Sequence, residues 1–599
     1  MTATLDEQEL GKAYDTALVR RLWTFVRPYR RIFWTALLLS PVNQFCTLVQ
    51  PVLVKIGLDR YVAMHDAAGL RLVALVFAAA IVGEFASYYW QQYFTMLVAQ
   101  RSLADLRVAT FAHLQRLPMR FYDRTPVGRV VSRVTSDVDV LNEMFAAGAM
   151  TILLDGLKLA GIVAFMVAID WRLALVSLAL LPAMVVAVDY FRRMARRTYR
   201  QIRERIAHIN GYLQEAITGM AVVQLSAREA RAYTEFRTLN GAYRDANHLS
   251  NKLEAALFSI VEAASTVSVA LLLLRGAGLH ARGAIELGTI VAFIQYIQQF
   301  FVPIRDFSAK YAVMQSAMTA AERIFGLLDL EPEPAPAEPR EPAVVHGAIE
   351  FDHVWFAYRG EDWVLRDVSF MIAPGEHVAL VGATGSGKTT IIKLLSRLYD
   401  VQRGAIRVDG VDVRDWDPQQ LRRRIAVVLQ DVFLFQGTVE QNLTLGDPAI
   451  DRARVERAVR QVNAGRFVAA LGGYDAPLRE RGSNLSTGQR QLLAFARALA
   501  HAPSVLVLDE ATSSVDPETE ALIQDALAKL LEGRTAVVIA HRLSTIEHAD
   551  RIFVMHKGEL RERGTHAELL ARGGLYARLY ALQYAPAQPV VEVGRGLAG

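Results

Sequence analysis

The stretch VALVGATGSGKTT, Val378–Thr390, decides the fold of the half of the chain in which it lies. A short apolar run leads into a glycine-rich turn, and the apolar stretch IIKLLSRL, residues 391–398, follows with the character of a helix. A strand, a glycine-rich turn and a helix in this order form a P-loop, whose backbone N–H groups surround phosphates. Lys388 is expected to reach the outer phosphates and Thr389 to bind Mg²⁺. The stretch therefore predicts a nucleotide-binding domain.

A second motif supports the same chemistry. SVLVLDE, residues 504–510, is a fully apolar run that ends in two acids, as a buried parallel strand would. Asp509 is expected to hold Mg²⁺ through water, and Glu510 to polarise an attacking water. Strands and helices alternate between the two motifs, which predicts a doubly wound α/β domain.

Length and composition indicate a second domain in a membrane. The chain has 599 residues, more than one hydrophobic core usually supports. Half of the residues are hydrophobic (52%), and the mean hydropathy is +0.21. The net charge of +5 is weak support for nucleic-acid binding, because membrane topology explains the arginines better. The single cysteine, Cys46, excludes an intrachain disulfide and a cysteine-based zinc site, and the polar N-terminus up to Asp15 shows no cleavable signal peptide.

Six apolar stretches of the N-terminal half are long enough, or nearly so, to cross a bilayer. They are Ile32–Val54, Leu72–Leu97, Phe145–Ile169, Leu173–Val188, Leu257–Leu274 and Leu287–Ile304. Four of their residues carry charge, Glu84, Asp155, Lys158 and Glu262, and must face protein or water. Asp155 and Lys158 form either an intrahelical pair or part of a polar substrate pathway.

Arginines set the expected orientation. They are dense before the first span and in the segments 98–145 and 192–256, which places these regions and the N-terminus in the cytoplasm. Both segments keep a helical pattern, so we expect membrane helices that project beyond the bilayer and return. The run EPEPAPAEPREP, residues 331–342, forbids helix and predicts a semi-rigid linker.

The expected domain organisation follows from these boundaries. It is an N-terminal cytoplasmic segment with an interfacial helix, a transmembrane domain of six helices, a Pro-rich linker, a nucleotide-binding domain and a tail. The ranges are 1–31, 32–328, 329–345, 346–585 and 586–599.

Taken together, the motifs resemble those of a half-size ABC exporter over nearly the whole chain. The ATPase motifs are VWFAYRG with Tyr358, the P-loop, VVLQDVFLFQGTVEQNL with Gln430, RERGSNLSTGQRQ, VLVLDEATSSVD and VVIAHRLSTI with His541. FYDRTPVGRVVSRVTSDVDVL (121–141) and YLQEAITGMAVVQLSAREA (212–230) resemble that family's first coupling region and later cytoplasmic helices. The resemblance implies a six-span α-helical bundle with long cytoplasmic extensions, fused to an α/β P-loop ABC ATPase domain.

The resemblance also implies roles for individual residues. Glu510, His541 and Gln430 would be catalytic, and Thr389, Gln430 and Asp509 would hold Mg²⁺. ATP would contact Tyr358, Gly382, Ala383, Thr384, Gly385, Ser386, Gly387, Lys388, Thr389 and Thr390 of one subunit. The signature residues Ser486, Thr487, Gly488 and Gln489, with Asp516, would face the nucleotide of a second subunit.

Thr487 departs from the family pattern, because the signature usually has glycine there. A Cβ branch restricts the backbone and its close approach to phosphate. With Glu510 retained, the pattern is similar to one half of a heterodimeric exporter. The implied function is ATP-driven export of amphipathic drugs or lipids by a multi-pass protein of a bacterial cytoplasmic membrane, both termini cytoplasmic, without nucleic acid. A homodimeric lipid flippase, or a membrane-tethered ATPase or gate that moves no substrate, are the alternatives.

Overall fold

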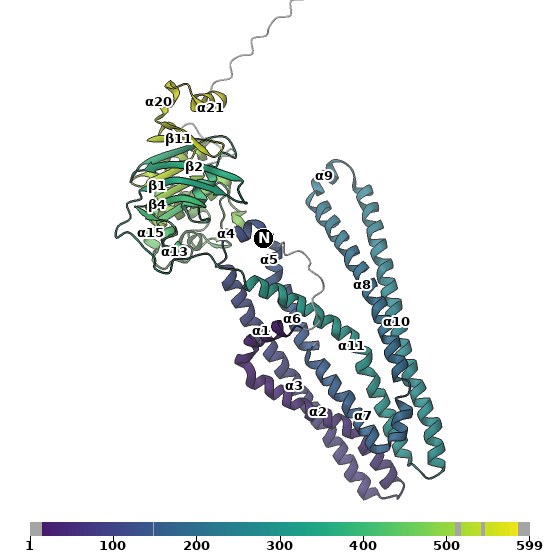
Figure 1. Ribbon diagram of the computed structural model, residues 1–599. Helices are drawn as coiled ribbons and strands as arrows, with labels where there is room; N and C mark the ends of the chain where they lie inside the picture. Colours follow the sequence, from purple (N-terminus) through teal and green to yellow (C-terminus); the bar gives the residue numbers. More distant parts are fainter. Residues whose placement is uncertain (1–14, 148, 510–516, 541–545, 585–599) are drawn as a thin grey trace, which may run out of the picture. The chain divides into compact units, whose positions relative to one another are not determined.

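The computed structural model describes residues 15–147, 149–509, 517–540 and 546–584. The chain divides into two compact units: Met1–Arg116 with Thr125–Glu331, and Leu117–Arg124 with Pro332–Gly599. The first unit consists of helices, and the second contains all the strands of the described part of the chain (Figure 1).

Long helices make up the first unit. They are α1 (Thr16–Val26), α2 (Arg30–Ile56), α3 (Ala67–Leu114), α5 (Val127–Val134), α6 (Ser136–Ala147), α7 (Ala149–Ser177), α8 (Leu181–Thr218), α9 (Met220–Leu225), α10 (Glu229–Ala281) and α11 (Leu287–Leu328). With 48 residues in α3 and 53 in α10, these two helices are about 70–80 Å long. Both exceed the ~30 Å thickness of the hydrocarbon core of a bilayer, so they extend well beyond it.

Five helical stretches in the described part of the chain are long and apolar enough to cross a membrane. The predicted fourth span, 173–188, is not one of these stretches and covers the end of α7 (to Ser177) and the start of α8 (from Leu181). Asp170 lies between the predicted third and fourth spans, and its backbone leaves the helical region there (φ −159°, ψ 109°). Its side chain accepts hydrogen bonds from the backbone N–H groups of Arg172 and Leu173, as an N-cap does.

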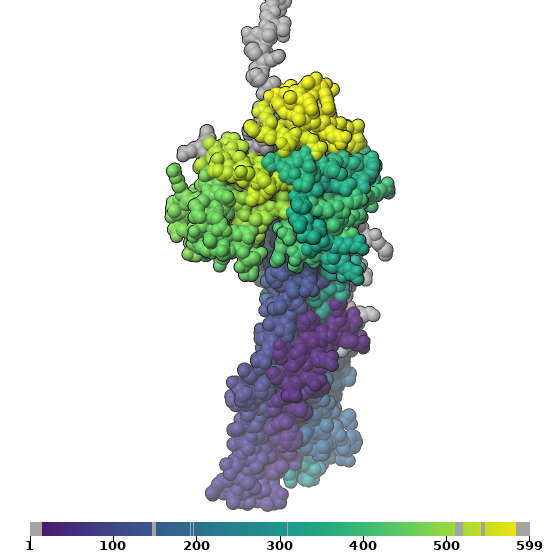
Figure 2. All heavy atoms as spheres, turned by 90° about the vertical axis from the view of Figure 1, so that its left-hand side faces the viewer, coloured from purple at the N-terminus to yellow at the C-terminus, as the bar shows by residue number. Residues whose placement is uncertain are grey.

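The helices of the first unit pack in two groups. α2 lies along α3, and α8 lies along α10, with α9 closing the α8–α10 hairpin (Figures 1 and 2). α11 contacts α2, α6, α7 and α10, and its Phe293 and Tyr296 are fully buried. The Tyr296 hydroxyl donates to the carbonyl oxygen of Leu48 on α2 at 2.6 Å, so α11 is the central helix of this unit.

Charged residues of the spans find partners on other helices. Asp155 of α7 forms its ion pair with Lys310 of α11. The ion pair of Asp155 is thus made with another helix and not with Lys158, which was the first of the two predicted alternatives. Lys310 lies beyond the predicted sixth span, which ended at Ile304. Glu84 of α3 accepts hydrogen bonds from two side chains of α2, Thr47 (3.0 Å) and Gln50.

The described part of the second unit has two larger sheets and a two-stranded sheet of β7 and β8. The strands are β1 (Ile349–Ala357), β2 (Trp363–Ile372), β3 (His377–Val381), β4 (Arg403–Val408), β5 (Val411–Asp412), β6 (Ile425–Val428), β7 (Gly437–Thr438), β8 (Pro477–Leu478), β9 (Val505–Asp509), β10 (Thr535–Ile539), β11 (Arg551–His556) and β12 (Glu559–Gly564). A six-stranded sheet has the order β12-β11-β3-β10-β9-β6, and a four-stranded antiparallel sheet the order β2-β1-β4-β5. β11, β3, β10, β9 and β6 run parallel.

The second unit also contains helices. They are α4 (Met119–Arg124), α12 (Lys388–Leu395), α13 (Pro418–Arg424), α14 (Val439–Thr444), α15 (Arg452–Gln461), α16 (Gly465–Ala470), α17 (Thr487–His501), α18 (Pro517–Leu531), α20 (His566–Ala571) and α21 (Leu575–Tyr584). The apolar run of β3 explains its place at the centre, since both of its faces are buried. Val378 and Leu380 pack in the core that includes α12, whereas Ala379 and Val381 pack with α20 and α21, the yellow segment of Figure 2.

Candidate nucleotide-binding site

The P-loop connects β3 to α12, and its backbone requires glycine at two positions. Gly382 has φ +156°, and a Cβ there would lie 2.3 Å from the carbonyl oxygen of Met555. Gly387 has φ +103°, and its Cβ would lie 2.6 Å from Leu365 Cδ2. Neither contact is possible for a real side chain, and the left-handed conformation of Gly387 also disfavours one. The two glycines therefore allow the loop to fold closely against the sheet.

Two side chains of the loop have polar groups that could bind phosphate oxygens. Lys388 is 7% exposed, and its Nζ donates to the carbonyl oxygens of Gly382 (2.6 Å) and Ala383 (3.1 Å). Burial lowers the pKa of Lys388, while attraction to Asp509 opposes the change. The Ser386 hydroxyl is buried and has no hydrogen-bond partner among the described residues. An ammonium and an unsatisfied hydroxyl beside the N-terminus of α12 fit the oxygens of a nucleoside polyphosphate.

The carboxyl ends of neighbouring parallel strands bring the other polar residues to this loop. Asp509 pairs in register with Ile539 of β10, which in turn pairs with Leu380 of β3. Gln430 follows β6, which is the neighbour of β9. Ten of the predicted residues line one cavity of about 720 Å³: Tyr358, Thr384, Gly385, Ser386, Gly387, Lys388, Thr389, Thr390, Gln430 and Asp509. Thr389, Gln430 and Asp509 supply the oxygen donors that Mg²⁺ prefers.

Tyr358 forms the aromatic wall of this cavity. Its hydroxyl lies 3.2 Å from the hydroxyl of Thr390, and its ring meets Tyr399 edge-on at a centroid distance of 5.2 Å. The Lys393 ammonium lies 5.4 Å from the centroid of the Tyr358 ring. Sequence reasoning missed Tyr399 and Lys393, since an isolated aromatic and a lysine on a helix give no signal. They pack against the Tyr358 ring and hold it in place.

The signature residues lie elsewhere in the unit. Ser486 caps α17 in a capping box, in which the Gln489 N–H donates to Ser486 Oγ (3.2 Å) and the Ser486 N–H to Gln489 Oε1 (3.0 Å). Arg490 Nη2 donates to the Thr487 hydroxyl at 3.2 Å. Within the described part of the chain, the P-loop cavity has no lining residue from the signature. Thr487 instead lines a separate cavity of about 390 Å³, which it shares with Gln430.

Three predicted residues, Glu510, Asp516 and His541, lie outside the described residues, so their predicted roles remain predictions. Asp509 is the last residue of β9.

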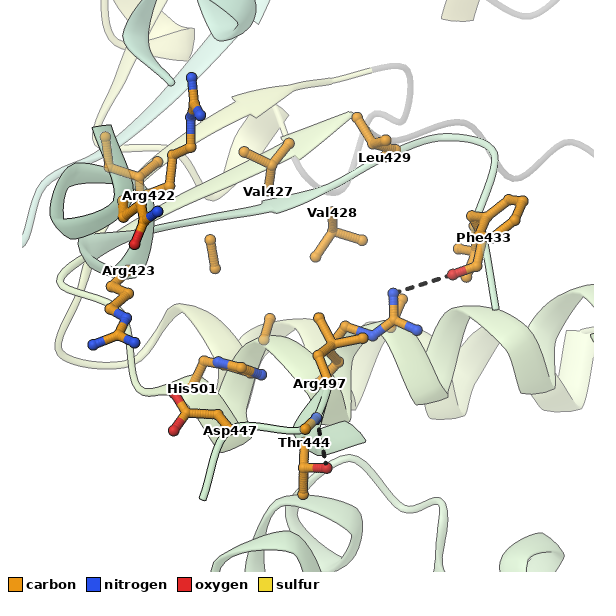
Figure 3. Close-up of a pocket in the computed structure, with 18 of the residues that line it drawn as sticks. Arg422, Arg423, Val427, Val428, Leu429, Phe433, Thr444, Asp447, Arg497 and His501 are labelled. Atoms are coloured by element: carbon orange, nitrogen blue, oxygen red, sulfur yellow. Dashed lines mark hydrogen bonds between the residues drawn. The ribbon is translucent and has the colours of Figure 1, made fainter. Parts of the chain in front are cut away.

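A further cavity, of about 630 Å³, lies between β6 and α17 (Figure 3). Arg497 crosses it and donates to the carbonyl oxygens of Phe433 (3.1 Å) and Asn442 (2.8 Å). His501 and Asp447 lie beside each other at its edge. Among the residues that the structure describes, no predicted nucleotide contact lines this cavity.

Comparisons with known proteins agree with this geometry. Residues 33–304 match the family described as ABC transporter transmembrane region, and residues 365–513 match the ABC transporter family. The chain is 35% identical to a putative ABC transporter ATP-binding protein, exp8, of Streptococcus pneumoniae, covering 96% of this chain and 98% of that one. It is 37% identical to the probable multidrug resistance ABC transporter ATP-binding/permease protein YheH of Bacillus subtilis (86% and 77% covered).

Two further similarities extend the comparison. A fatty acid ABC transporter ATP-binding/permease protein of Mycobacterium tuberculosis is 37% identical, with 87% of this chain and 82% of that one covered. The solved structure of a bacterial Atm1-family ABC exporter with ATP bound superposes with a TM-score of 0.75 at 28% identity, over 93% of this chain and 99% of that one. The P-loop cavity, the helical unit and these matches lead to one conclusion: this chain is a member of the ABC transporter family, with an exporter-type transmembrane region and an ABC ATPase fused in one polypeptide.

Proposed function

We propose that this protein is one subunit of a heterodimeric exporter that uses ATP and Mg²⁺ to move amphipathic drugs or lipids across the cytoplasmic membrane of a bacterium. The observation that carries the proposal is the P-loop cavity, where Lys388 and Ser386 are available to bind phosphate oxygens. The same chain has apolar helices that contain paired charged residues. The relatives named for multidrug resistance and for fatty acids support amphipathic cargo. Both termini would lie in the cytoplasm.

The predicted site residues divide the work of hydrolysis between them. Tyr358 stacks on adenine, and the P-loop N–H groups and Lys388 bind the phosphates. Thr389, Gln430 and Asp509 would hold Mg²⁺, which neutralises charge on the phosphates when it is bound. Glu510 takes the proton of the attacking water, and His541 stabilises charge on the γ-phosphate.

Thr487 supports the heterodimer. In the arrangement that the family resemblance implies, the signature of one subunit completes the nucleotide site of the other. A branched residue in the signature weakens the partner's site, while this chain's own site keeps Glu510. A homodimer is the second candidate, because the capping box of Ser486 and Gln489 is intact despite Thr487.

Inverted membrane vesicles test the proposal. Vesicles containing the full-length chain and its partner subunit should accumulate an amphipathic dye when ATP is added. Glu510→Gln should keep ATP binding and lose turnover by about 100-fold or more, because it removes the base and preserves shape. Lys388→Ala should lose nucleotide affinity itself, because it removes a phosphate-facing charge. Lys529→Ala, an exposed cation on α18, is the control. Accumulation that needs no ATP, or that survives Glu510→Gln, contradicts the proposal.

A further inference from the structure

Among the described residues, most acidic side chains within or just beyond the predicted spans have partners. Glu84 accepts from Thr47 and Gln50, Asp155 pairs with Lys310, and Asp306 pairs with Arg305 at 3.0 Å. Glu262 of α10 has no hydrogen bond or ion pair with any residue that the structure describes, and its side chain is exposed. An unpaired carboxylate in an apolar span is costly when it faces lipid, so such a residue marks a polar pathway or a ligand.

The surroundings of Glu262 on α10 form a binding surface. A hollow of about 650 Å³ is lined by Glu262 with Phe258, Ser259, Ala263, Thr266 and Val267. Phe258 is 50% exposed and Val267 47%. The opposite face of α10 is the one that packs inside the unit, through buried residues that include Val261, Ser268 and Leu272. The Glu262 face is exposed in this chain, with the Phe258 ring also beside Arg305 of α11, and it combines one negative charge with an aromatic ring, a hydroxyl and aliphatic groups.

Basic side chains of the same spans are already engaged. Lys310 pairs with Asp155. Arg305 pairs with Asp306, and its guanidinium lies 5.2 Å from the centroid of the Phe258 ring. Phe258 lies one helical turn from Glu262 on α10. Lys158 on α7 interacts electrostatically with Asp155 and Glu84. Within the described part of these spans, this chain therefore has no uncommitted cation to pair with Glu262.

The position of Glu262 suits the headgroup of an amphipath. It lies five residues inside the apolar stretch 257–274, about 7–8 Å along the helix from the end that we place toward the cytoplasm. A cationic amphipath that pairs its headgroup with Glu262 would enter from the inner leaflet and keep its apolar body deeper in the span. Thr266 and Val267 lie one turn deeper on the same face.

We propose that Glu262 is a specificity-determining residue that selects amphipathic organic cations, such as alkylammonium compounds, as cargo. Its carboxylate pairs with the cationic headgroup, and Phe258 and Val267 contact the apolar body. This inference rests on the proposed export function and adds to it the charge of the substrate.

Three matched probes test the selection. They share one alkyl chain and one neutral fluorophore and end in trimethylammonium, hydroxyl or carboxylate. Binding to the full-length protein in nanodiscs is measured by fluorescence anisotropy. The wild-type protein should bind the trimethylammonium probe most tightly. Glu262→Gln should weaken that binding on the order of tenfold, as expected for the loss of one partly desolvated ion pair, and leave the hydroxyl probe unchanged.

Two further variants control for structure. Glu262→Asp should keep the preference for the cation. Glu229→Gln, an exposed acid at the start of the same helix, should behave as the wild-type protein does. An equal preference for the cation in Glu262→Gln, no preference in the wild type, or tightest binding of the carboxylate probe would each overturn the proposal.

ATP-dependent accumulation of the same probes in inverted vesicles separates this inference from the function on which it rests. If none of the three probes accumulates with ATP, the proposed export function fails. If all three accumulate equally, export stands and the role of Glu262 is overturned.

Discussion

Single residues of the P-loop show how far local sequence determines a site. Ser386 and Lys388 are enclosed by a turn whose shape follows from glycine at Gly382 and Gly387. The motif contains all of these residues, so the sequence predicts both the shape of the phosphate-binding loop and the ligand that it binds. Tyr399, which holds Tyr358, is separated from it by 41 residues of chain and belongs to no motif. Its contribution follows only from the three-dimensional packing.

His501 gives a prediction about pH at the residue scale. It ends α17 and lines the cavity of Figure 3. Burial lowers its pKa from the ordinary 6.5, and the positive charges of Arg454 and Arg497 act in the same direction, while the Leu443 backbone and Asp447 oppose them. The folded protein therefore stays neutral at His501 where the unfolded chain takes up a proton. The resulting stability is complete above pH ~6.5 and is lost as the pH falls toward the lower folded pKa, with a slope of at most about 1.4 kcal/mol per pH unit.

The measurement compares apparent melting temperatures of the full-length protein in detergent at pH 7.5 and 5.5. His501→Gln should lose less stability on acidification than the wild-type protein. His548→Gln, an exposed histidine of the same unit, serves as the control. An equal or larger loss in His501→Gln would contradict the buried neutral imidazole.

At the scale of elements, the start of the linker is bound to the ATPase unit, whereas the sequence predicted only a semi-rigid connection. The prolines of residues 331–342 exclude helix, and the structure has none between α11 and β1. Arg422 of α13 binds the Glu333 carboxylate with both Nη atoms, and Arg397 donates to the carbonyl oxygen of Pro334 at 3.1 Å. The start of the linker is thus held on the ATPase unit instead of spanning freely.

Long-range side-chain pairs explain what the sequence could not predict. Glu333 and Arg422 are 89 residues apart, and Asp155 and Lys310 are 155 apart. Hydrophobic patterns locate helices, but they carry no information about which charged groups meet across them. Asp170 caps the chain within an apolar region, between the predicted third and fourth spans, and a hydropathy pattern does not register such a cap.

The helix α4 carries a prediction about coupling. It groups with the ATPase unit, and Arg124 Nη2 donates to the carbonyl oxygen of Tyr358 at 3.4 Å. Arg124 begins the sequence RTPVG, 124–128, which we place at a cytoplasmic turn. Arg124→Ala should lower the amount of probe transported per ATP hydrolysed, because it removes a link to Tyr358, which we propose to stack on the base, and should leave ATP binding intact.

The coupling test measures transported probe and released phosphate in the same vesicles. Gly128→Ala is the matched control, because a Cβ at Gly128 meets nothing within 4 Å. An unchanged ratio of transport to hydrolysis in Arg124→Ala would contradict the coupling role.

A labelling experiment tests the topology: Thr125→Cys, introduced in a Cys46→Ser background, should react with a membrane-impermeant label only from the cytoplasmic side. Labelling from outside would show that the six-span topology is wrong.

On the scale of the whole molecule, one chain combines a membrane unit with an ATPase whose P-loop cavity has no signature residue among its described lining. ABC exporters act as dimers, so a second subunit is expected to supply that signature. In the proposed arrangement, Thr487 would act on the nucleotide of the partner, and Glu510 on the nucleotide of this chain. Under this proposal, the identity of the partner would determine which of the two sites turns over.

Thr487→Gly separates the two kinds of dimer. The variant loses the hydrogen bond that Arg490 donates to the Thr487 hydroxyl. It keeps the cap, because Ser486 and Gln489 form it, and it restores the backbone freedom of glycine. In a heterodimer, Thr487 serves a site that contributes little hydrolysis. The ATPase rate of the complete transporter should then change by less than about twofold, within the ~0.4 kcal/mol that a minor site can contribute to the barrier, and the chain purified alone should be a poor ATPase.

In a homodimer, Thr487 lies in both working sites, and replacing it should alter turnover at both. The decisive measurement is the steady-state ATPase rate of the chain purified alone in nanodiscs, with its oligomeric state determined on the same sample. Glu510→Gln supplies the baseline, because it removes the catalytic carboxylate from every site that the chain forms by itself. A brisk ATPase that amphipathic drugs or lipids stimulate in the wild-type chain, and that Glu510→Gln abolishes, would rule out the heterodimer, because no second subunit is then needed to complete a working site.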